Sequence, residues 1–279
     1  MNLTETAIQL EALRRTNHRE DLFPAEGASP EGGPNSPPGV PYPEYEELIQ
    51  KLGPSPTGTA LLGFCQDGLP LLLDLASNSQ GGLLLLDPQP DHIRTLLTGI
   101  IASVIELSPP ESIEIFLISP RLDQFPHPPE GAFAFRWADM RGRAAHSLLY
   151  EFLSAAGNQE YHQPDGRLRL LVLDEAHQFI PGLDRYTQDL LSWVAVNGPS
   201  QGCRVVASSL AIESGFLLPE SFTTSCQVRV YGHHPGSPAA SQATAPRIES
   251  PGQAGTGYFS INIAGESTPF WLPNPAAAA

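Results

Sequence analysis

Two adjacent carboxylates, Asp174 and Glu175, are the residues of this chain best suited to metal or hydrolytic chemistry. They directly follow the apolar run LRLLVL, residues 168–173, which predicts a strand buried on both faces. Ligands of α/β proteins bind at the carboxyl ends of such strands. There, one carboxylate can hold Mg²⁺ through water while the other orients a water molecule for attack on a phosphate. A strand that ends in a solvated helix start is the alternative interpretation, because acidic side chains are also favoured there.

A phosphate-binding loop would have to come from the strand-loop-helix pattern at residues 83–105. The motif G-x-x-x-x-G-K-[ST] uses glycines so that backbone N–H groups can surround the phosphate, and a lysine to neutralise charge. The segment DPQPDHIRT, residues 87–95, aligns with this motif without a gap. The alignment puts Asp87 and His92 at the glycines, Ile93 at the lysine and Arg94 at the hydroxyl. Every defining residue is therefore replaced.

The composition of this loop predicts that ordinary Mg-ATP binding is lost. Pro88 and Pro90 lack N–H donors, and two aspartates place like charge beside the phosphate. Losing one or two charge-assisted contacts of about 1.5–3 kcal/mol each weakens binding by tens to thousands of fold. Arg94 and Thr95 remain candidate nucleotide contacts if the register slips by one, because arginine binds phosphate well and a helix N-terminus is partly positive.

Composition limits the other classes of function. The 279 residues are 41% hydrophobic, enough for one sizeable core. A net charge of -15 argues against a surface that holds DNA by itself, because phosphate neutralisation needs clustered Lys and Arg. Three cysteines without metal-ligand spacing predict buried thiols in a reducing compartment. No apolar run approaches the roughly 20 residues of a membrane span, and we expect a cytoplasmic protein.

The chain divides by composition into four parts. Apolar residues at helical spacing predict an N-terminal helix within residues 1–22. Residues 23–43 are rich in Pro, Gly, Ser and Glu, which is typical of a flexible linker. We expect one folded domain over residues 44–273 and a disordered tail at residues 274–279.

Strand-like and helix-like runs alternate in the folded part, which predicts an α/β fold with a mostly parallel sheet covered by helices, and edge hairpins. The expected strands span residues 60–65, 70–75, 83–86, 113–118, 168–173, 204–208, 227–232, 257–263 and 268–272. The expected helices span residues 44–52, 91–107, 143–156 and 184–197.

The folded part resembles the FtsK/HerA superfamily of DNA-pumping ATPases, which have a RecA-like domain. The resemblance rests on four segments in the family's order: residues 61–87, IEIFLISPRLDQF at 113–125, LDEAHQFIP at 173–181 and NGPSQGCRVVASSL at 197–210. It implies that Asp174 is the Mg²⁺ ligand, Glu175 the catalytic carboxylate and Ser208 a nucleotide-sensing residue. It also implies subunits that contact one another around the nucleotide.

The resemblance and the altered loop together lead to two hypotheses. The first is a domain without ATP hydrolysis and without a cofactor, acting as a structural or regulatory subunit. It would bind a protein partner, such as an intact ATPase of the same superfamily in a mixed ring, and DNA only indirectly or weakly. The second is an active DNA-translocase ATPase that uses Mg-ATP with a non-standard loop. A binder of another anion or small molecule remains a third alternative.

Four arginines are further candidates. Arg136, Arg141 and Arg143 form a local basic cluster that either contacts a partner or begins a solvated helix. Arg229 is the nearest candidate for an arginine finger.

The histidines and tryptophans favour structural roles. His177 is expected to start a helix, and His233 and His234 lie in a Gly/Pro-rich turn without a third metal ligand at suitable spacing. The three tryptophans sit among apolar neighbours and are expected in the core: Trp137, Trp193 and Trp271.

Overall fold

The computed structural model describes residues 43–53, 55–65, 67–78, 80–126, 134–157, 166–212, 215–232 and 257–273. The expected N-terminal helix, all of the linker before residue 43, and the tail lie outside these residues. The turn with His233 and His234 also lies outside them.

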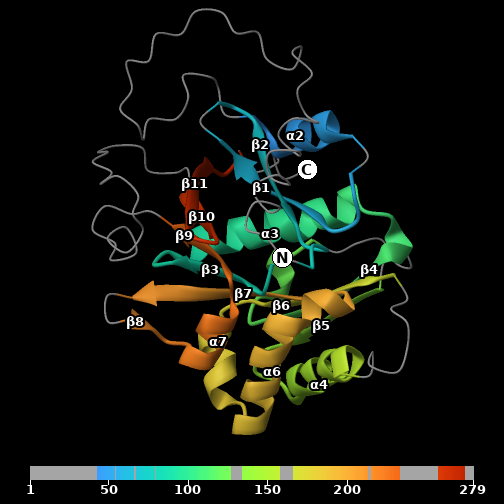
Figure 1. Cartoon of the computed structure of the whole chain (residues 1–279), viewed down its shortest axis with the longest axis vertical. Coiled ribbons are helices and arrows are strands. Elements are labelled where there is room, and N and C mark those ends of the chain that lie inside the picture. The colour runs from blue at the N-terminus through green and yellow to red at the C-terminus, as the bar shows by residue number, and fades with distance from the viewer. Residues whose placement is uncertain are drawn as a thin grey trace, which may run out of the picture.

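One sheet organises the described residues (Figure 1). Its strands are β1 (Thr59–Phe64), β2 (Pro70–Asp74), β3 (Leu83–Asp87), β4 (Ile113–Ser119), β5 (Ala134–Asp139), β6 (Leu168–Leu173), β7 (Cys203–Ile212), β8 (Gly215–Phe216), β9 (Val228–Gly232), β10 (Tyr258–Ile263) and β11 (Glu266–Trp271). The strand order is β2-β1-β11-β10-β9-β3-β7-β6-β4-β5, with β8 paired to β7. The block from β9 to β5 is parallel, and the remaining pairs are antiparallel. The expected α/β class, parallel sheet and edge hairpin of β1 and β2 are therefore confirmed.

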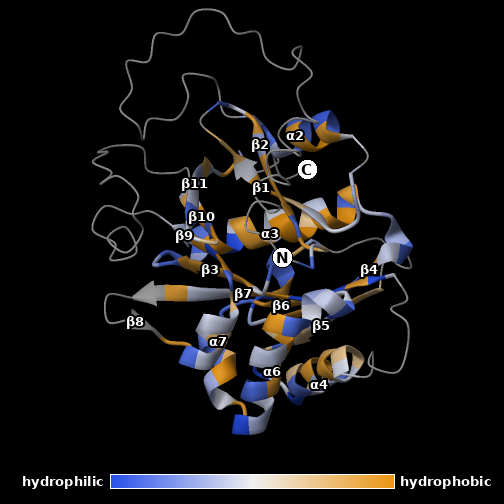
Figure 2. Cartoon of the chain, viewed as in Figure 1, coloured by the Kyte–Doolittle hydropathy of each residue, from blue (hydrophilic) through white to orange (hydrophobic). Residues whose placement is uncertain are grey.

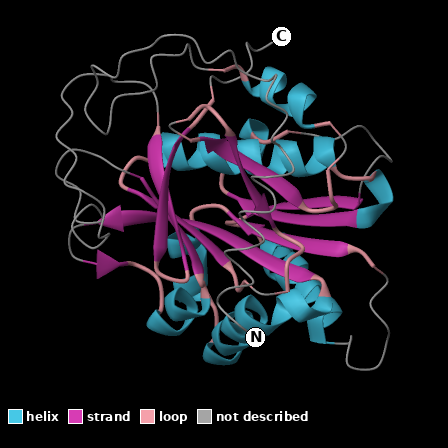
Figure 3. Cartoon of the chain, turned by 45° about the horizontal axis from the view of Figure 1, so that its top comes forward, coloured by secondary structure: helices cyan, strands magenta, loops and turns pink. Residues whose placement is uncertain are grey.

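Helices cover both faces of this sheet (Figure 3). They are α2 (Tyr45–Leu52), α3 (Pro90–Leu107), α4 (Arg143–Gly157), α5 (Ala176–Phe179), α6 (Arg185–Asn197) and α7 (Glu220–Ser225). Figure 1 shows α2 and α3 on one side of the parallel strands and α4, α6 and α7 on the other.

Burial on both faces explains the continuous apolar runs of the parallel strands. In β3, Leu83 and Leu85 belong to the hydrophobic cluster under α3, whereas Leu84 and Leu86 belong to the cluster under α4 and α6. All four are at most 1% exposed. Because side chains of a strand alternate between faces, a strand with helices on both sides buries residues on both faces, which favours a continuous apolar run such as that of β3. Figure 2 shows the same pattern as hydrophobic colour along the central strands.

Two of the three tryptophans depart from the expectation. Trp271 is buried and stacks on Phe64 at the β1–β11 pair. Trp137 is 50% exposed, because β5 is an edge strand with β4 on only one side. Trp193 is 40% exposed on the outer side of α6. The prediction that these last two lie in the core was wrong, because apolar sequence neighbours do not reveal which face another element covers.

The three cysteine side chains are buried, as expected. Among the residues that the structure describes, no helix combines the length and hydrophobicity needed to span a membrane.

Candidate functional site

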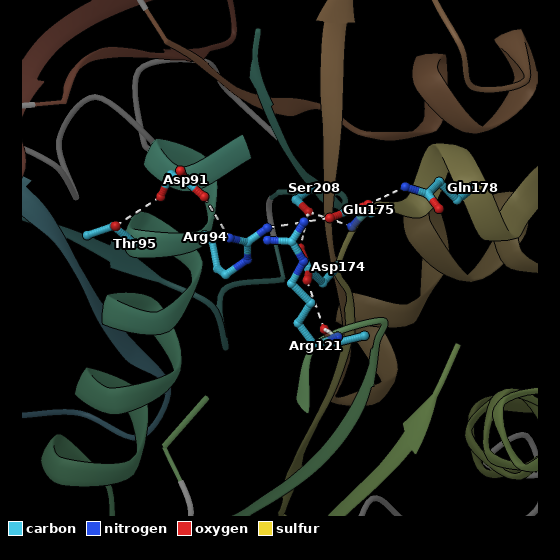
Figure 4. A network of polar contacts seen from close by, with 9 residues as sticks. Asp91, Arg94, Thr95, Arg121, Asp174, Glu175, Gln178 and Ser208 are labelled. Carbon is cyan, nitrogen blue, oxygen red and sulfur yellow. Dashed lines mark hydrogen bonds and ion pairs between the residues drawn. The ribbon is translucent and has the colours of Figure 1, made fainter. Parts of the chain in front are cut away.

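The carboxyl ends of three adjacent strands, β4, β6 and β7, bring the polar residues of the site together. Asp174 follows β6 and is 1% exposed. Its Oδ2 accepts a hydrogen bond of 2.8 Å from the Ser119 hydroxyl at the end of β4. Its Oδ1 accepts one of 3.0 Å from the Ser208 hydroxyl in β7 (Figure 4). A buried carboxylate is costly without such partners, so two serine hydroxyls hold Asp174 in place.

The next residue, Glu175, adopts a left-handed backbone conformation with φ 54° and ψ 44°. This conformation costs a non-glycine residue about 1–2 kcal/mol. The Glu175 N–H donates a 2.8 Å hydrogen bond to the Ser208 hydroxyl oxygen, which offsets part of that cost. Ser208 therefore contacts both members of the acidic pair, the Asp174 side chain and the Glu175 backbone.

An arginine from the first turns of α3 meets this side chain. Arg94 is 6% exposed, and its Nη2 lies 3.4 Å from Glu175 Oε1. Its Nη1 lies 2.9 Å from Oδ1 of Asp91, one helical turn earlier. The second oxygen of Glu175 accepts a hydrogen bond from the Gln178 side-chain amide. Figure 4 shows this network running from α3 across the strand ends to α5.

The connection between β3 and α3 consists of only Pro88 and Gln89, because α3 already begins at Pro90. The Gln89 N–H donates a 2.7 Å hydrogen bond to the Asp87 carboxylate within the same turn. The first turn of α3 thus occupies positions that the motif alignment assigned to the loop. Pro88 has no N–H donor, and the N–H of Gln89 is bonded within the turn.

Ile93, aligned with the motif's lysine, points away from this site. It is 3% exposed and belongs to the hydrophobic cluster beneath α3. A side chain at this position lies in the core.

Two other groups border the network. The Arg121 N–H bonds to the Ser119 hydroxyl at 3.0 Å, and its side chain extends toward Arg94 and Glu175 (Figure 4). His177, the second residue of α5, has a pKa lowered by burial, although the neighbouring carboxylates of Glu175 and Asp174 oppose that shift. The described residues contain no cluster of three His, Cys, Asp or Glu side chains able to hold a metal ion.

The structure brings together four of the five predicted site residues: Asp174, Glu175, Arg94 and Ser208. Thr95 lies elsewhere, exposed on the side of α3 turned away from Glu175, with its hydroxyl bonded to the Asp91 carbonyl oxygen at 2.9 Å. Sequence reasoning did not name Ser119 or Gln178 as site residues. The signal for Ser119 was its place as the first polar residue after the apolar run of β4.

The other candidate arginines have local partners or lie apart. Arg229 donates to the carbonyl oxygens of Cys226 and Thr223 at 3.2 and 3.0 Å, at the end of α7. Arg136 pairs with Glu114 and Glu151. Arg141 and Arg143 are exposed where α4 begins.

Parallel strands covered by helices, with an Asp-Glu pair at the end of β6, define the class: the chain has the α/β fold of the EssC ATPases and of the conjugation coupling protein TcpA. The pCW3 conjugation coupling protein TcpA with ATPγS superposes with a TM-score of 0.59 at 12% identity, over 85% of this chain and 71% of TcpA. EssC ATPases 2 and 3 of Geobacillus thermodenitrificans give 0.62 at 14% identity, over 85% of this chain and 45% of that one.

A third similar structure, Thermomonospora curvata EccC ATPases 2 and 3 with a signal sequence peptide, gives a TM-score of 0.55 at 16% identity, over 86% and 43% of the two chains. The chain thus spans less than half the length of these EssC and EccC structures. No protein-family model and no curated protein sequence matches it.

Proposed function

We propose that this chain is an ATPase-fold domain that does not hydrolyse ATP and serves as a structural or regulatory subunit of an ATPase or DNA-translocase assembly. The single observation that carries the proposal is the Arg94–Glu175 ion pair at the strand ends. Glu175, the carboxylate that would orient the attacking water, is instead paired with Arg94 of the same chain.

The β3–α3 connection supports the same conclusion. Of its two residues, Pro88 has no N–H, and the Gln89 N–H is already bonded to Asp87. The buried Asp87 carboxylate also adds negative charge where a phosphate would approach. A triphosphate at this turn would meet few donors and a like charge.

The carboxylates of Asp174 and Glu175, which would bind Mg²⁺ and water, already have hydrogen-bond partners within the chain. Both oxygens of Asp174 accept hydrogen bonds from serine hydroxyls, and both oxygens of Glu175 are bonded to Arg94 and Gln178. A hydrolytic carboxylate must instead present a lone pair to water. The acidic pair is therefore suited to holding β4, β6, β7, α3 and α5 together.

The proposed partner is an intact ATPase of the same superfamily, in a mixed ring or similar assembly. Retention of the complete sheet supports this role, because an ATPase fold without its chemistry still offers its subunit-contacting faces. The net charge of -15 favours a basic partner over self-association or direct DNA binding.

An active ATPase with a non-standard loop is the second candidate. The observation in its favour is that Asp174, Glu175, Ser208 and Arg94 still lie together at the strand ends. In this alternative Arg94 would leave Glu175 and contact a phosphate.

The decisive experiment compares ATP turnover by the purified full chain and by Glu175→Gln, with calorimetric titration of ATP in the presence of Mg²⁺. We expect neither turnover nor binding above background in either protein. Turnover that disappears in Glu175→Gln would establish the second candidate. Pull-down from native extract with quantitative mass spectrometry, beside a DNA titration at two salt concentrations, tests the assembly role. A monomer that recovers no partner and binds duplex DNA tightly at physiological salt would refute it.

A further inference from the structure

A cavity of about 580 Å³ lies beside α3, on the side where α2 packs against that helix (Figure 1). This volume falls within the range of about 300–1,000 Å³ that is usual for small-molecule sites. The lining includes the carboxylates of Glu46, Asp91 and Glu106. Arg94 also lines the cavity, but its charge is directed to Asp91 and Glu175. The cavity therefore presents a net negative charge to a ligand.

Two of these carboxylates belong to the two helices that meet at the cavity. Glu46 is the second residue of α2, and Glu106 is the last but one of α3. Burial, together with the negative charge of Glu46, raises the pKa of Glu106, so the two carboxylates are close enough to repel each other. In the part of the chain that the structure describes, neither has an ion-pair partner. A cation between them would relieve this repulsion.

The hydroxyl oxygen of Tyr45, which also lines the cavity, is a third acceptor. Burial and, after it, the charge of Glu106 raise the pKa of Tyr45, so the hydroxyl stays neutral at neutral pH. The neighbouring Ser103 hydroxyl donates its hydrogen to the Ile100 carbonyl oxygen at 3.0 Å. Among the described residues the buried Tyr45 oxygen has no hydrogen-bond partner. Leaving a buried polar atom unsatisfied is costly, and a ligand donor would remove that cost.

Two carboxylates and one hydroxyl oxygen match the donors of a primary ammonium group. An ammonium has three N–H donors and no acceptor, so each of the three groups can accept one hydrogen bond. Ca²⁺ is a poorer match, because it takes about six to eight oxygen ligands. The described residues also contain no cluster of three His, Cys, Asp or Glu side chains.

The cavity continues from the acidic pair along α3, where the side chains are small. Ala102 and Gly99 line this part, at intervals of about one helical turn from Glu106. A Cβ added at Gly99 would meet no atom within 4 Å, so the space beside it is open. An unbranched alkyl chain that leads away from the ammonium group fits this space.

We propose that the cavity between α2 and α3 binds a linear aliphatic amine. Its ammonium group donates to Glu46, Glu106 and the Tyr45 hydroxyl oxygen, and its alkyl chain lies along α3 past Ala102 and Gly99. The bound amine connects α2 to α3. This site uses neither Asp174 nor Glu175 and does not depend on the function proposed above.

Calorimetric titration of the full chain with hexylamine, which is cationic at neutral pH, tests the proposal. We expect saturable binding at one site. Glu106→Gln and Tyr45→Phe should each weaken it at least about tenfold, because each removes an acceptor of a charge-assisted hydrogen bond. Glu47→Gln makes the same charge change at an exposed position of α2 outside the cavity and should leave the affinity unchanged.

Ligand and cavity variants separate the parts of the site. Hexanol lacks the charge, and trimethylhexylammonium keeps the charge but lacks N–H donors, so both should bind at least about tenfold more weakly than hexylamine. Gly99→Leu should abolish binding by filling the open space, while urea denaturation shows that the variant still folds.

Three results would overturn the proposal. One is the absence of saturable hexylamine binding by the natural chain. Another is equal weakening by Glu106→Gln and Glu47→Gln, which would show a general attraction of cations to an acidic chain. The third is unchanged binding by a folded Gly99→Leu variant, which would place the amine outside this cavity.

Discussion

The Arg94 guanidinium lies 3.4 Å from the Glu175 carboxylate, and this ion pair ties the start of α3 to the end of β6. The two residues are 81 positions apart in the chain. Both side chains are largely shielded from water, so each depends on the other to offset its desolvation.

This dependence predicts non-additive mutational effects. Arg94→Met and Glu175→Gln should each lower the free energy of unfolding by about 1–3 kcal/mol, because each leaves a shielded charged partner. The double variant should lose less than the sum of the two changes. Urea denaturation of the four proteins measures the coupling. The exposed Arg185–Asp189 pair on α6 is the matched control and should contribute at most about 0.5 kcal/mol. Strict additivity at Arg94 and Glu175 would contradict the prediction.

Restoring the motif's lysine should not restore nucleotide binding. In Ile93→Lys the new ammonium would enter the core beneath α3, which should lower the free energy of unfolding by at least about 2 kcal/mol. Thr95→Lys, on the exposed side of the same helix, should change stability by less than about 0.5 kcal/mol. Denaturation and a calorimetric ATP titration check both statements. ATP binding by Ile93→Lys would show that the β3–α3 backbone was never the obstacle.

Replacing Arg204 should lower the stability of the fold by a large amount. It is 2% exposed in β7 and donates to four backbone carbonyl oxygens, those of Leu75, Ser77, Gln80 and Gly81. Burial lowers its pKa to about 10, so it stays charged at neutral pH. Arg204→Met leaves these carbonyls without their donor and should cost about 3–5 kcal/mol in urea denaturation. Arg185→Met, at an exposed position, is the control. Equal losses of unfolding free energy in the two variants would contradict a stabilising role of the Arg204 hydrogen bonds.

His177 should make stability depend on pH. Burial lowers its pKa in the folded state below the ordinary value of 6.5. As the pH falls through 6.5, the unfolded chain therefore binds a proton before the folded one does, and stability decreases. The stabilisation is fully present above this window and is lost toward the folded-state pKa. His177→Asn should show a smaller loss between pH 7.5 and pH 5 than the natural chain, measured by denaturation at both values. The same loss of stability between pH 7.5 and pH 5 in both proteins would contradict the role given to His177.

Local patterns were sufficient for most of the fold. The run of leucines in β3 predicted a strand buried on both faces, and α3 begins one residue from its expected start. The edge strand β5 was not predicted, because it lacks the continuous apolar run of the other parallel strands: Arg136 and Trp137 are exposed, and of its residues only Ala138 is buried. Exposure of this kind depends on neighbouring elements that the local sequence does not specify.

The sequence by itself determined that residues 87–95 lack the glycines and lysine of a phosphate loop and that an acidic pair ends an apolar strand. Only the tertiary structure decided that Arg94, rather than Thr95, faces Glu175. Successive residues of a helix point about 100° apart, so the packing of α3 on the sheet selects which one enters the site. The strand order decided which residues meet at the acidic pair. Because β7 lies beside β6, Ser208 holds both Asp174 and Glu175, a contact between distant segments that no local periodicity encodes.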